Sequence, residues 1–461
     1  MRDFAVITEI PYRDPVSAFA PLAGSDFAAL LDSADQSAEG RCSYIAVDPF
    51  RVIACTPHPW EVSIDGRPVE GNAFDVLAEA LRAHTWRPDS PVPFCGGAVG
   101  FFSYELGGLL ENLPVPKTTP LPKDMVVGLY DVIAAFDHVA RKAFVIASGF
   151  PETGEARRGR AEFRAAWLAR ALGTVSVPAK NYPPVFWRAE SRRTQHEARV
   201  AAAIEAIRAG DIYQANITQR FHAPLPWGAE PFALYRKLRA RSPAPFGAFL
   251  NCGDGLTLLS ASPERFLACD TAGRVETRPI KGTRPRGTTP EEDKANAREL
   301  RASAKDIAEN LMIVDLLRND LSRVCDPGSV EAPVLCGLET FASVHHLVSV
   351  ITGQMRKDKC AIDLLKAAFP GGSVTGAPKI RAMEIIHNLE PSARGPYCGA
   401  IAWLGFDGAM DSSIVIRTLV LNAGEAVAQA GGGIVADSEP ALEFEESLAK
   451  VAPLLATLGN L

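Results

Sequence analysis

The sequence has no long hydrophobic run and no excess of basic charge. No uninterrupted apolar stretch approaches the roughly 20 residues that a membrane-spanning helix needs. The opening residues, MRDFAVITEI, lack the basic region and the following apolar region of a secretory signal peptide. With 48 Lys and Arg against 54 Asp and Glu, the net charge of −6 argues against a nucleic-acid partner. We therefore expect a cytoplasmic protein that binds neither membranes nor nucleic acids.

Paired cysteines are also missing. The nine cysteines are scattered and none belongs to a C-x-x-C pair, which argues against a zinc site or a dithiol redox motif. An odd number of unclustered cysteines fits reduced, mostly buried thiols. The chain also shows no internal repeat and no low-complexity tract.

The composition that remains is that of an ordinary globular enzyme, with 47% hydrophobic and 22% charged residues. The 461 residues exceed the size at which a single core usually stops growing, so two lobes or one compound domain are expected. The stretch 173–187 contains prolines and lacks periodicity, which marks it as a linker. We therefore predict an N-terminal region at 1–172 and a catalytic region at 188–461, packed as one compound unit.

Hydrophobic periodicity predicts a mixture of strands and helices. In the N-terminal region, short apolar runs alternate with turn signals, which indicates strands and a few short helices. Later strands are predicted at 245–251, 256–260, 264–269, 397–406, 412–421 and 426–430. Helices are predicted at 151–171, 194–209, 291–302, 304–320, 361–369, 378–389 and 441–456. This pattern predicts an α+β fold with large, mainly antiparallel sheets and helices packed outside.

The segment PIKGTRPRG (279–287) contains a candidate nucleophile. Cationic neighbours disfavour the ammonium form, so Lys281 could become a neutral amine near neutral pH. Arg284 and Arg286 could grip a carboxylate with two hydrogen bonds each. A nucleophile beside an anion clamp suggests covalent chemistry on a small acid. Composition alone favours the alternative, an exposed basic turn.

Two predicted helices carry pairs of carboxylates. Asp306 and Glu309 share one face of the first, which opens with a capping box at Ser303. Glu443 and Glu446 lie along one stripe of the last helix, in line with Lys450. Facing carboxylates could hold Mg²⁺, which prefers oxygen ligands. The alternative is a pair of solvated helix faces, with an ordinary salt pair between Glu446 and Lys450.

Two glycine-rich turns could bring backbone amides close to a ligand. Gly371 and Gly376, in PGGSVTGAPK (370–379), have the spacing of a P-loop, but Ala377 and Pro378 stand where Lys and Ser or Thr are required. Nucleotide binding is therefore disfavoured, although amides at the start of the following helix could bind an anion. The run 431–433 of three glycines permits close backbone approach, or alternatively tight sheet packing.

Four further residues are candidates only in combination with these segments: Glu264, His346, Tyr397 and Arg417. A lone histidine between apolar residues is more often a core residue than a catalyst. Glu264, which follows a proline, could simply begin a strand.

Taken together, the segments closely resemble the chorismate-utilising enzymes, a family that includes anthranilate, aminodeoxychorismate, isochorismate and salicylate synthases. The matches follow the family's order over about 250 C-terminal residues, and weaker matches occur at 30–33, 44–49 and 96–107. The matching stretches are GDIYQANITQRF (210–221), SPERFL (262–267), RPIKGTRPRG (278–287), AENLMIVDLLRND (308–320), VHHLVS (344–349), FPGGSVTGAPKIRAMEII (369–386), YCGAI (397–401), IVIRTL (414–419), AGGGIVADS (430–438) and EFEESLAK (443–450). The resemblance implies the family's sandwich of large antiparallel sheets.

Lys281 indicates the branch of the family. The anthranilate and isochorismate branches generally have alanine in a PIAGT sequence, whereas the aminodeoxychorismate branch has PIKGT, as this chain does. Water-using members place a lysine base at the position that corresponds to Gln214. Glutamine cannot activate water in that way, so the resemblance implies ammonia as the nucleophile. The expected product is 4-amino-4-deoxychorismate, the precursor of 4-aminobenzoate and folate.

The resemblance also implies roles for individual residues. Lys281 would attack ring carbon 2 of chorismate, Glu264 would protonate the hydroxyl leaving carbon 4, and His346 would complete the catalytic group. Mg²⁺ would bind the ring carboxylate through Glu309 and Glu446, supported by Asp306 and Glu443. The expected substrate-binding residues are Thr283, Ser373, Thr375, Gly376, Tyr397, Arg417, Gly431, Gly432, Gly433 and Lys450.

No glutamine-hydrolysing domain and no aminodeoxychorismate lyase domain is recognisable in the sequence. Ammonia is therefore expected from a separate glutamine amidotransferase subunit. Leu31-Asp32-Ser33 and the segment SPAPF (242–246) resemble the family's tryptophan pocket. The resemblance leaves open whether tryptophan would bind there, inhibit the enzyme or merely fill the core.

Three alternatives remain at this point. The first is an anthranilate synthase component I, against which Lys281 argues. The second is a P-loop phosphotransferase, which Ala377 and Pro378 disfavour. The third is a non-catalytic regulatory homologue, which the presence of the acids and Lys281 disfavours.

Overall fold

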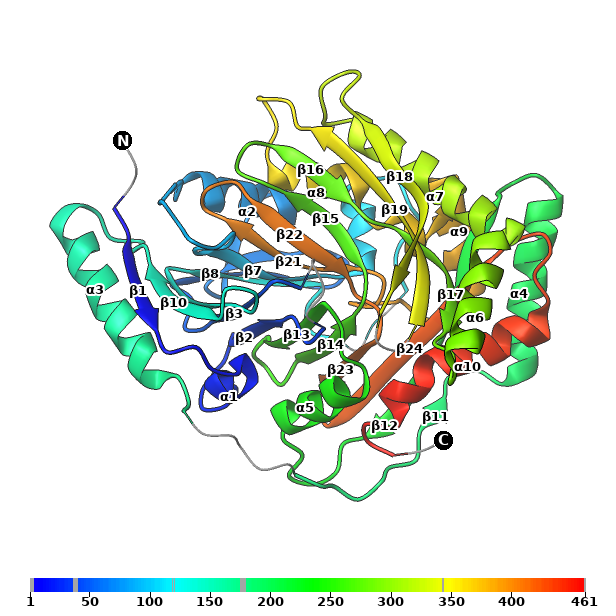
Figure 1. Cartoon of the computed structure of the whole chain (residues 1–461), viewed down its shortest axis with the longest axis horizontal. Coiled ribbons are helices and arrows are strands. Elements are labelled where there is room, and N and C mark those ends of the chain that lie inside the picture. The colour runs from blue at the N-terminus through cyan, green and yellow to red at the C-terminus, as the bar shows by residue number, and fades with distance from the viewer. Residues whose placement is uncertain are drawn as a thin grey trace.

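The computed structural model describes residues 4–35, 40–117, 119, 121–174, 180–341 and 344–459. The chain forms two large β-sheets with helices packed around them (Figure 1). Every strand pair in the described residues is antiparallel, so the predicted α+β fold with antiparallel sheets is confirmed.

The first sheet has 12 strands. In spatial order these are β1 (Val6–Ile10), β10 (Lys142–Ala147), β9 (Val132–Asp137), β3 (Cys42–Ala46), β2 (Ala29–Asp32), β13 (Phe246–Asn251), β14 (Thr257–Ser262), β23 (Thr418–Asn422), β24 (Glu425–Ile434), β12 (Gln214–Pro224) and β11 (Arg188–Ala189), with β20 (Gly376–Ala377) also paired to β12.

The second sheet also has 12 strands. Their order is β17 (Ile280–Pro285), β19 (Val344–Gln354), β16 (Arg274–Thr277), β15 (Arg265–Cys269), β22 (Met410–Ile414), β21 (Ala400–Gly405), β7 (Gly97–Phe102), β8 (Met125–Tyr130), β4 (Arg51–Cys55), β5 (Val62–Ile64) and β6 (Arg67–Val69), with β18 (Glu331–Thr340) on the other side of β19.

Helices are distributed over both ends of the molecule. Figure 1 shows α3 beside β1 and β10 at one end and α4, α6, α7, α9 and α10 gathered at the other. None of the helices in the described ranges is both long enough and apolar enough to cross a membrane. They are α1 (Pro15–Phe19), α2 (Ala73–Arg82), α3 (Gly154–Ala171), α4 (Arg193–Arg208), α5 (Pro231–Arg241), α6 (Pro290–Ala302), α7 (Ala304–Ser322), α8 (Ala361–Ala368), α9 (Lys379–Leu389) and α10 (Pro440–Leu455), with 3₁₀ turns η1 (Tyr104–Leu109) and η2 (Gly372–Val374).

Both sheets combine strands from the two predicted regions. Strand β2 pairs with β13 in the first sheet, and β7 pairs with β21 in the second. Part of the predicted linker, residues 175–179, lies outside the described residues. The division at 1–172 and 188–461 stays a prediction.

The main core lies between the sheets. It includes the fully buried Phe101 and Leu258, one from each sheet, and Tyr44 packs edge-on against Trp403 at a ring separation of 6.2 Å. A second apolar cluster lies under α3, α5 and α10, and a third joins α4 and α9 to β12. Burial of apolar side chains on both faces therefore holds the sheets rigidly in place.

The chain passes from one sheet to the other at two points that carry predicted site residues. Strand β14 of the first sheet ends at Ser262 and β15 of the second begins at Arg265, so Glu264 lies in the first crossover. The prediction of one strand at 412–421 is wrong, because β22 and β23 belong to different sheets. Arg417 lies in this second crossover with φ of 52°, in the left-handed region that non-glycine residues rarely adopt.

Gly376→Ala is expected to lower the free energy of unfolding by about 2 kcal/mol or more. Gly376 has φ of 156°, and a Cβ there would lie 2.1 Å from the carbonyl oxygen of Gln214, the residue before its cross-strand partner Ala215 on β12. Chemical denaturation measures the change. Gly159→Ala is the matched control, because Gly159 lies in α3 with open space around it. It should raise stability by about 0.5–1 kcal/mol, and an equally mild effect at Gly376 would contradict the packing constraint.

Candidate active site

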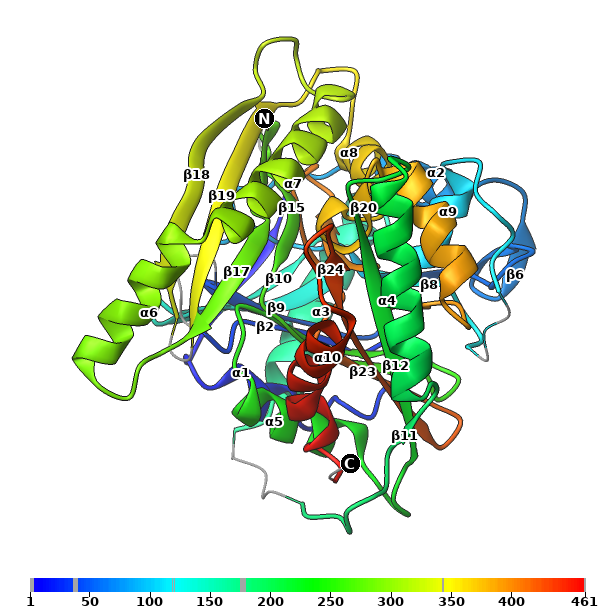
Figure 2. The same cartoon turned by 90° about the vertical axis from the view of Figure 1, so that its right-hand side faces the viewer.

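The predicted site residues gather where α7, α10, β17, β24 and η2 meet. Figure 2 looks onto this end of the molecule, with α10 in front, α6 and α7 on one side and α4 and α9 on the other. Helix α7 packs on β17 and η2, and α10 packs on β24. Segments more than 150 residues apart in the sequence therefore contribute to one site.

Lys281 lies in strand β17 and not in an exposed basic turn, the alternative that composition alone favoured. The strand pairs with β19, and the register shifts between Lys281 and Thr283. Gly282, with φ of 76°, occupies this bulge and lets α7 approach, since a Cβ there would lie 3.0 Å from the Asp306 side chain. The half-buried Lys281 Nζ donates a hydrogen bond to the Ser373 carbonyl at 3.3 Å.

Burial lowers the pKa of Lys281, against the opposing charges of Glu309 and Glu264. The reason given by the sequence, the neighbouring arginines, is wrong. Arg284 pairs with Glu299 at 2.8 Å and with Asp306 at 3.3 Å, and Arg286 pairs with Asp293 at 2.7 Å. The cation that acts on Lys281 is Lys450. The two arginines therefore hold α6 and α7 against β17 and do not form the expected anion clamp.

Glu264 lies beside Lys281 and is well placed to act as an acid. Burial raises the pKa of Glu264 to about 7, although hydrogen bonding from the Ser373 side chain and the charge of Lys281 oppose the shift. Ser373 therefore contacts both groups, the carboxyl through its hydroxyl and the amine through its carbonyl. Burial thus shifts both groups toward their uncharged forms, by lowering the pKa of the amine and raising the pKa of the carboxyl.

His346 contacts the bulge that follows Lys281. Its Nδ1 lies 2.9 Å from Thr283 Oγ1, and its ring also hydrogen-bonds the Gly282 backbone. Burial, together with the charge of Arg417, lowers the pKa of His346 to about 4. His346 is thus an uncharged hydrogen-bonding group at neutral pH and fixes the shape of the strand beside the nucleophile.

Arg417 and Lys450 supply positive charge on the opposite wall. Burial lowers the pKa of Arg417, and the buried Tyr397 opposes this shift. Among the described residues, Arg417 Nη1 bonds only the Lys450 carbonyl, at 2.8 Å. A half-buried guanidinium without a carboxylate partner is a ready site for a substrate carboxylate.

The three glycines form the end of β24, beside the acidic stripe of α10. Lys450 Nζ donates to the Gly431 carbonyl at 3.1 Å. A Cβ at Gly432 would lie 3.0 Å from Glu443 Oε2 and 3.8 Å from both Glu446 Oε1 and Lys450 Nζ. A side chain at Gly432 would therefore crowd the ends of these helix side chains, while glycine is required at Gly431, where a Cβ would lie 2.2 Å from the Ile217 carbonyl oxygen.

The carboxylates of α7 and α10 face one another. Burial raises the pKa of Glu309, and the negative charges of Asp306 and Glu443 raise it further. Burial likewise raises the pKa of Glu443, which accepts a 2.7 Å hydrogen bond from Ser438. Burial would raise the pKa of Glu446 too, but the Lys450 ammonium 2.6 Å away outweighs it and lowers the pKa. These acids thus form one mutually repelling group.

This donor set suits a hard cation. Mutually repelling carboxylates at one site are stabilised by a bound ion, and an all-oxygen set with room for water is what Mg²⁺ prefers. In the described part of the chain, however, no group of three or more His, Cys, Asp or Glu side chains is assembled that could hold a metal ion. Asp306 is also engaged by Arg284. The acids fit Mg²⁺ in chemistry, while the predicted four-acid site stays a prediction.

Two predicted substrate-binding residues are buried inside the structure around η2. The Thr375 hydroxyl donates to the Gly371 carbonyl at 3.1 Å, and its backbone carbonyl accepts from Asn216. Gly376 pairs with β12 as described above. Both residues shape the turn that carries Ser373.

Two polar residues of β12 were missed as site residues by the sequence analysis. Asn216 Nδ2 donates to the Ser373 carbonyl at 2.9 Å. Gln214, which the analysis used only to infer the nucleophile, is fully buried, and no partner for either polar atom of its amide occurs among the described residues. Alternate polar residues in the apolar segment QANIT (214–218) were the only signal that the sequence offered.

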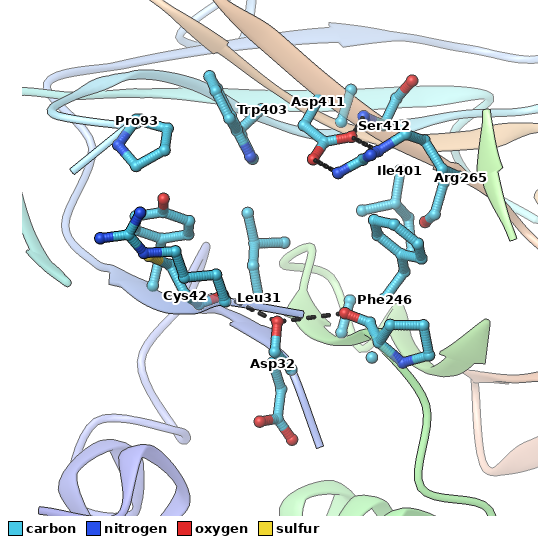
Figure 3. Close-up of a pocket in the computed structure, with 18 residues that line it drawn as sticks. Leu31, Asp32, Cys42, Pro93, Phe246, Arg265, Ile401, Trp403, Asp411 and Ser412 are labelled. Atoms are coloured by element: carbon cyan, nitrogen blue, oxygen red, sulfur yellow. Dashed lines mark hydrogen bonds and ion pairs between the residues drawn. The ribbon is translucent and has the colours of Figure 1, made fainter. Parts of the chain in front are cut away.

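A cavity of about 260 Å³ lies between the sheets and is lined by none of these residues (Figure 3). Trp403 and Pro93 line one side and Leu31 and Phe246 the other, and an Arg265–Asp411 ion pair closes one end at 3.0 Å. The two segments that resemble a tryptophan pocket therefore meet at one cavity.

Comparison with known proteins identifies the class of enzyme that this site defines. Residues 26–456 match the family model of chorismate binding enzymes. The chain belongs to the chorismate-binding enzyme family, and it is a chorismate-utilising enzyme.

Its relatives include enzymes of two kinds. The chain is 41% identical over 460 residues to aminodeoxychorismate synthase component 1 of Klebsiella aerogenes, covering 98% of each chain. It is 40% identical over 465 residues to anthranilate synthase component 1 of Streptomyces coelicolor, covering 96% of this chain and 86% of the relative. The structure of anthranilate synthase component I from Streptococcus pneumoniae superimposes with a TM-score of 0.80 at 34% identity, covering 90% of this chain and 92% of that one.

Proposed function

We propose that the protein converts chorismate and ammonia into 4-amino-4-deoxychorismate. Overall identity does not separate this activity from that of an anthranilate synthase, since relatives of both kinds are about 40% identical to the chain. The observation that carries the proposal is the Lys281 amine, half-buried beside Glu264 and without a carboxylate ion-pair partner in the described residues. Aminodeoxychorismate synthases share the PIKGT sequence that supplies this amine.

The reaction then proceeds in two substitutions. The uncharged Lys281 amine attacks ring carbon 2, the two conjugated ring double bonds shift, and the hydroxyl at carbon 4 leaves as water with the proton of Glu264. Ammonia adds at carbon 4 and returns one proton to Glu264, the two double bonds shift back, and Lys281 leaves carbon 2 as the free amine. One ammonia is consumed and one water is released. Pyruvate is not eliminated.

The remaining residues bind the two carboxylates of the substrate. Arg417, Tyr397 and Lys450 hold the enolpyruvyl carboxylate against the amides of Gly431–Gly433. Glu309 and Glu446, with Asp306 and Glu443 nearby, would hold Mg²⁺, which would bind the ring carboxylate. When bound, Mg²⁺ neutralises substrate charge and fixes the orientation of the ring.

A second protein is the proposed source of ammonia. The relatives named component 1 belong by name to enzymes with a further component. We propose that a glutamine amidotransferase subunit supplies ammonia to this chain in the cytoplasm.

The product made by the purified chain tests the proposed function. With chorismate, Mg²⁺ and ammonium chloride, mass spectrometry should detect aminodeoxychorismate as the main product. Fluorescent anthranilate as the main product would instead support an anthranilate synthase, and isochorismate would point to water as the nucleophile.

The pH dependence of kcat/KM is expected to be bell-shaped. Glu264 must be protonated to act as an acid, so activity falls on the alkaline side, with an apparent pKa at or above about 7. Lys281 must be uncharged, so activity also falls on the acidic side, below its lowered pKa. Glu264→Gln should lose the alkaline limb and roughly 10²- to 10⁴-fold of the rate. An unchanged alkaline limb in Glu264→Gln would assign the acid to another residue.

A further inference from the structure

The buried Arg394, which has no role in the proposed mechanism, links three segments next to Lys281 and Glu264: the residue after α9, the turn η2 and strand β12. Arg394, 2% exposed, follows α9. Its Nη1 donates to the Val374 carbonyl of η2 at 2.9 Å, and its Nη2 donates to the Asn216 carbonyl of β12 at 2.7 Å. Its Nε and Nη2 also form a two-pronged pair with Glu390, at 2.9 and 2.8 Å.

Glu390, the ion-pair partner of Arg394, is itself held in place by hydrogen bonds from β12. It is 4% exposed, and its Oε1 also accepts hydrogen bonds from the backbone and hydroxyl of Thr218, at 3.0 and 2.8 Å. The Arg394 guanidinium lies over the Tyr104 ring at 4.6 Å, and Glu105 accepts from the Arg394 backbone at 2.6 Å. All three nitrogens of the guanidinium thus donate hydrogen bonds to surrounding groups, which makes its geometry rigid.

The turn held by Arg394 is the one that contacts both catalytic groups. Val374, whose carbonyl Arg394 binds, directly follows Ser373. The Ser373 carbonyl accepts from Lys281 Nζ at 3.3 Å and from Asn216 Nδ2 at 2.9 Å, while its hydroxyl bonds Glu264. Asn216 is itself held by Arg394 through its backbone. Arg394 therefore acts on the nucleophile and the acid through Ser373, which it reaches by way of Val374 and Asn216.

We infer that Arg394, braced by Glu390, is a positioning residue that holds the Gly372–Val374 turn so that Ser373 aligns Lys281 with Glu264. The inference deepens the proposed function and rests on it for the chemistry. A planar fork is needed, because lysine has a single nitrogen and cannot reach Val374, Asn216 and Glu390 together. Arg394 touches neither substrate nor reacting atoms in this account.

Displacement of the Gly372–Val374 turn would change the pKa values of Glu264 and Lys281. Loss of the Ser373 hydroxyl bond would raise the pKa of Glu264, because that bond favours the ionised carboxylate. Entry of water beside Lys281 would raise its pKa toward the ordinary value, because burial is what lowers it. The charged groups that face the pair, Glu309, Glu446 and Lys450, lie on α7 and α10 and would stay in place.

Arg394→Lys tests the inference by steady-state kinetics across pH. We expect kcat to fall roughly 10- to 100-fold with a much smaller change in KM for chorismate, because the groups that bind the substrate are untouched. The acidic limb of the pH profile, which reports the ionisation of Lys281, should move to higher pH. Arg164→Lys is the matched control, since Arg164 is 5% exposed and bonds Asp131 and Asp48 far from the site. It should lower the thermal midpoint to a similar extent without moving either limb.

A second readout does not depend on turnover. The rate at which acetic anhydride modifies Lys281, followed by mass spectrometry across pH, should show a higher pKa in Arg394→Lys than in the wild type. If Arg394→Lys does not fold, Asn216→Ala replaces it, because it removes one bond to Ser373 and leaves the Arg394–Glu390 pair intact. Unchanged limbs and unchanged Lys281 labelling in the folded variant would overturn the inference. Failure of the wild type to make aminodeoxychorismate would refute the proposed function, while the labelling comparison would still test the positioning role.

Discussion

Replacing Lys281 by alanine is expected to lower kcat for aminodeoxychorismate formation by about 10³-fold or more. The variant lacks the only amine that the structure places beside Glu264 among the described residues. Direct attack of ammonia on the substrate would have to replace a two-step covalent route. Product formation measured by mass spectrometry at saturating chorismate and ammonium gives the rate.

Lys305→Ala is the matched control for this variant. Lys305 lies 4.0 Å from Glu309 on the same side of the site, but its side chain is 53% exposed. Loss of this weak surface pair should change kcat by less than about threefold. A Lys281→Ala variant with kcat near that of Lys305→Ala would contradict the nucleophilic role, even if both enzymes make the proposed product.

Glu309→Gln is expected to lower kcat/KM for chorismate by about 10²-fold or more and to raise the Mg²⁺ concentration needed for half-maximal activity. Glu309 lies between Lys281 and the acids of α10, so its negative charge contributes both to metal binding and to the field at the amine. Replacement by an amide keeps the volume but removes the charge. Isothermal titration with Mg²⁺, without substrate, measures the binding change independently of activity.

The control on the same helix is Asp315→Asn. The Asp315 side chain is 82% exposed and pairs only with Arg318 among the described ion pairs. This variant should bind Mg²⁺ like the wild type. Equal Mg²⁺ dependence in Glu309→Gln and the wild type would refute the metal-binding role of the acids.

The sequence predicted most helices because their signals are local. Helix α7 begins where Ser303 caps the Asp306 amide, and α4 ends just before Gly210, which has φ of 83°. The break between β22 and β23 was not predictable in this way. The segment IVIRTLV (414–420) is continuously β-forming. Its two ends join different sheets because of pairing with strands remote in sequence.

The candidate active site was likewise predictable only where its signals are local in the sequence. The motifs identified Lys281, Glu264 and the acids, because residue spacing and family resemblance can both be read from the sequence. The glycine and prolines around Lys281 suggested a turn, whereas pairing with β19 makes the segment a strand. The partners of Arg284 and Arg286 lie on α6 and α7, so their engagement became visible only in three dimensions. Arg394 carries no local signal at all.

The mass of the intact protein after incubation with chorismate and Mg²⁺, in the absence of ammonia, tests the covalent role of Lys281 most directly. We predict a species heavier than the free chain by chorismate minus one water, with the added group mapped to Lys281 and absent from Lys281→Ala. Complete conversion of chorismate when ammonium is added, without any such adduct on the wild-type chain under rapid quenching, would contradict the account.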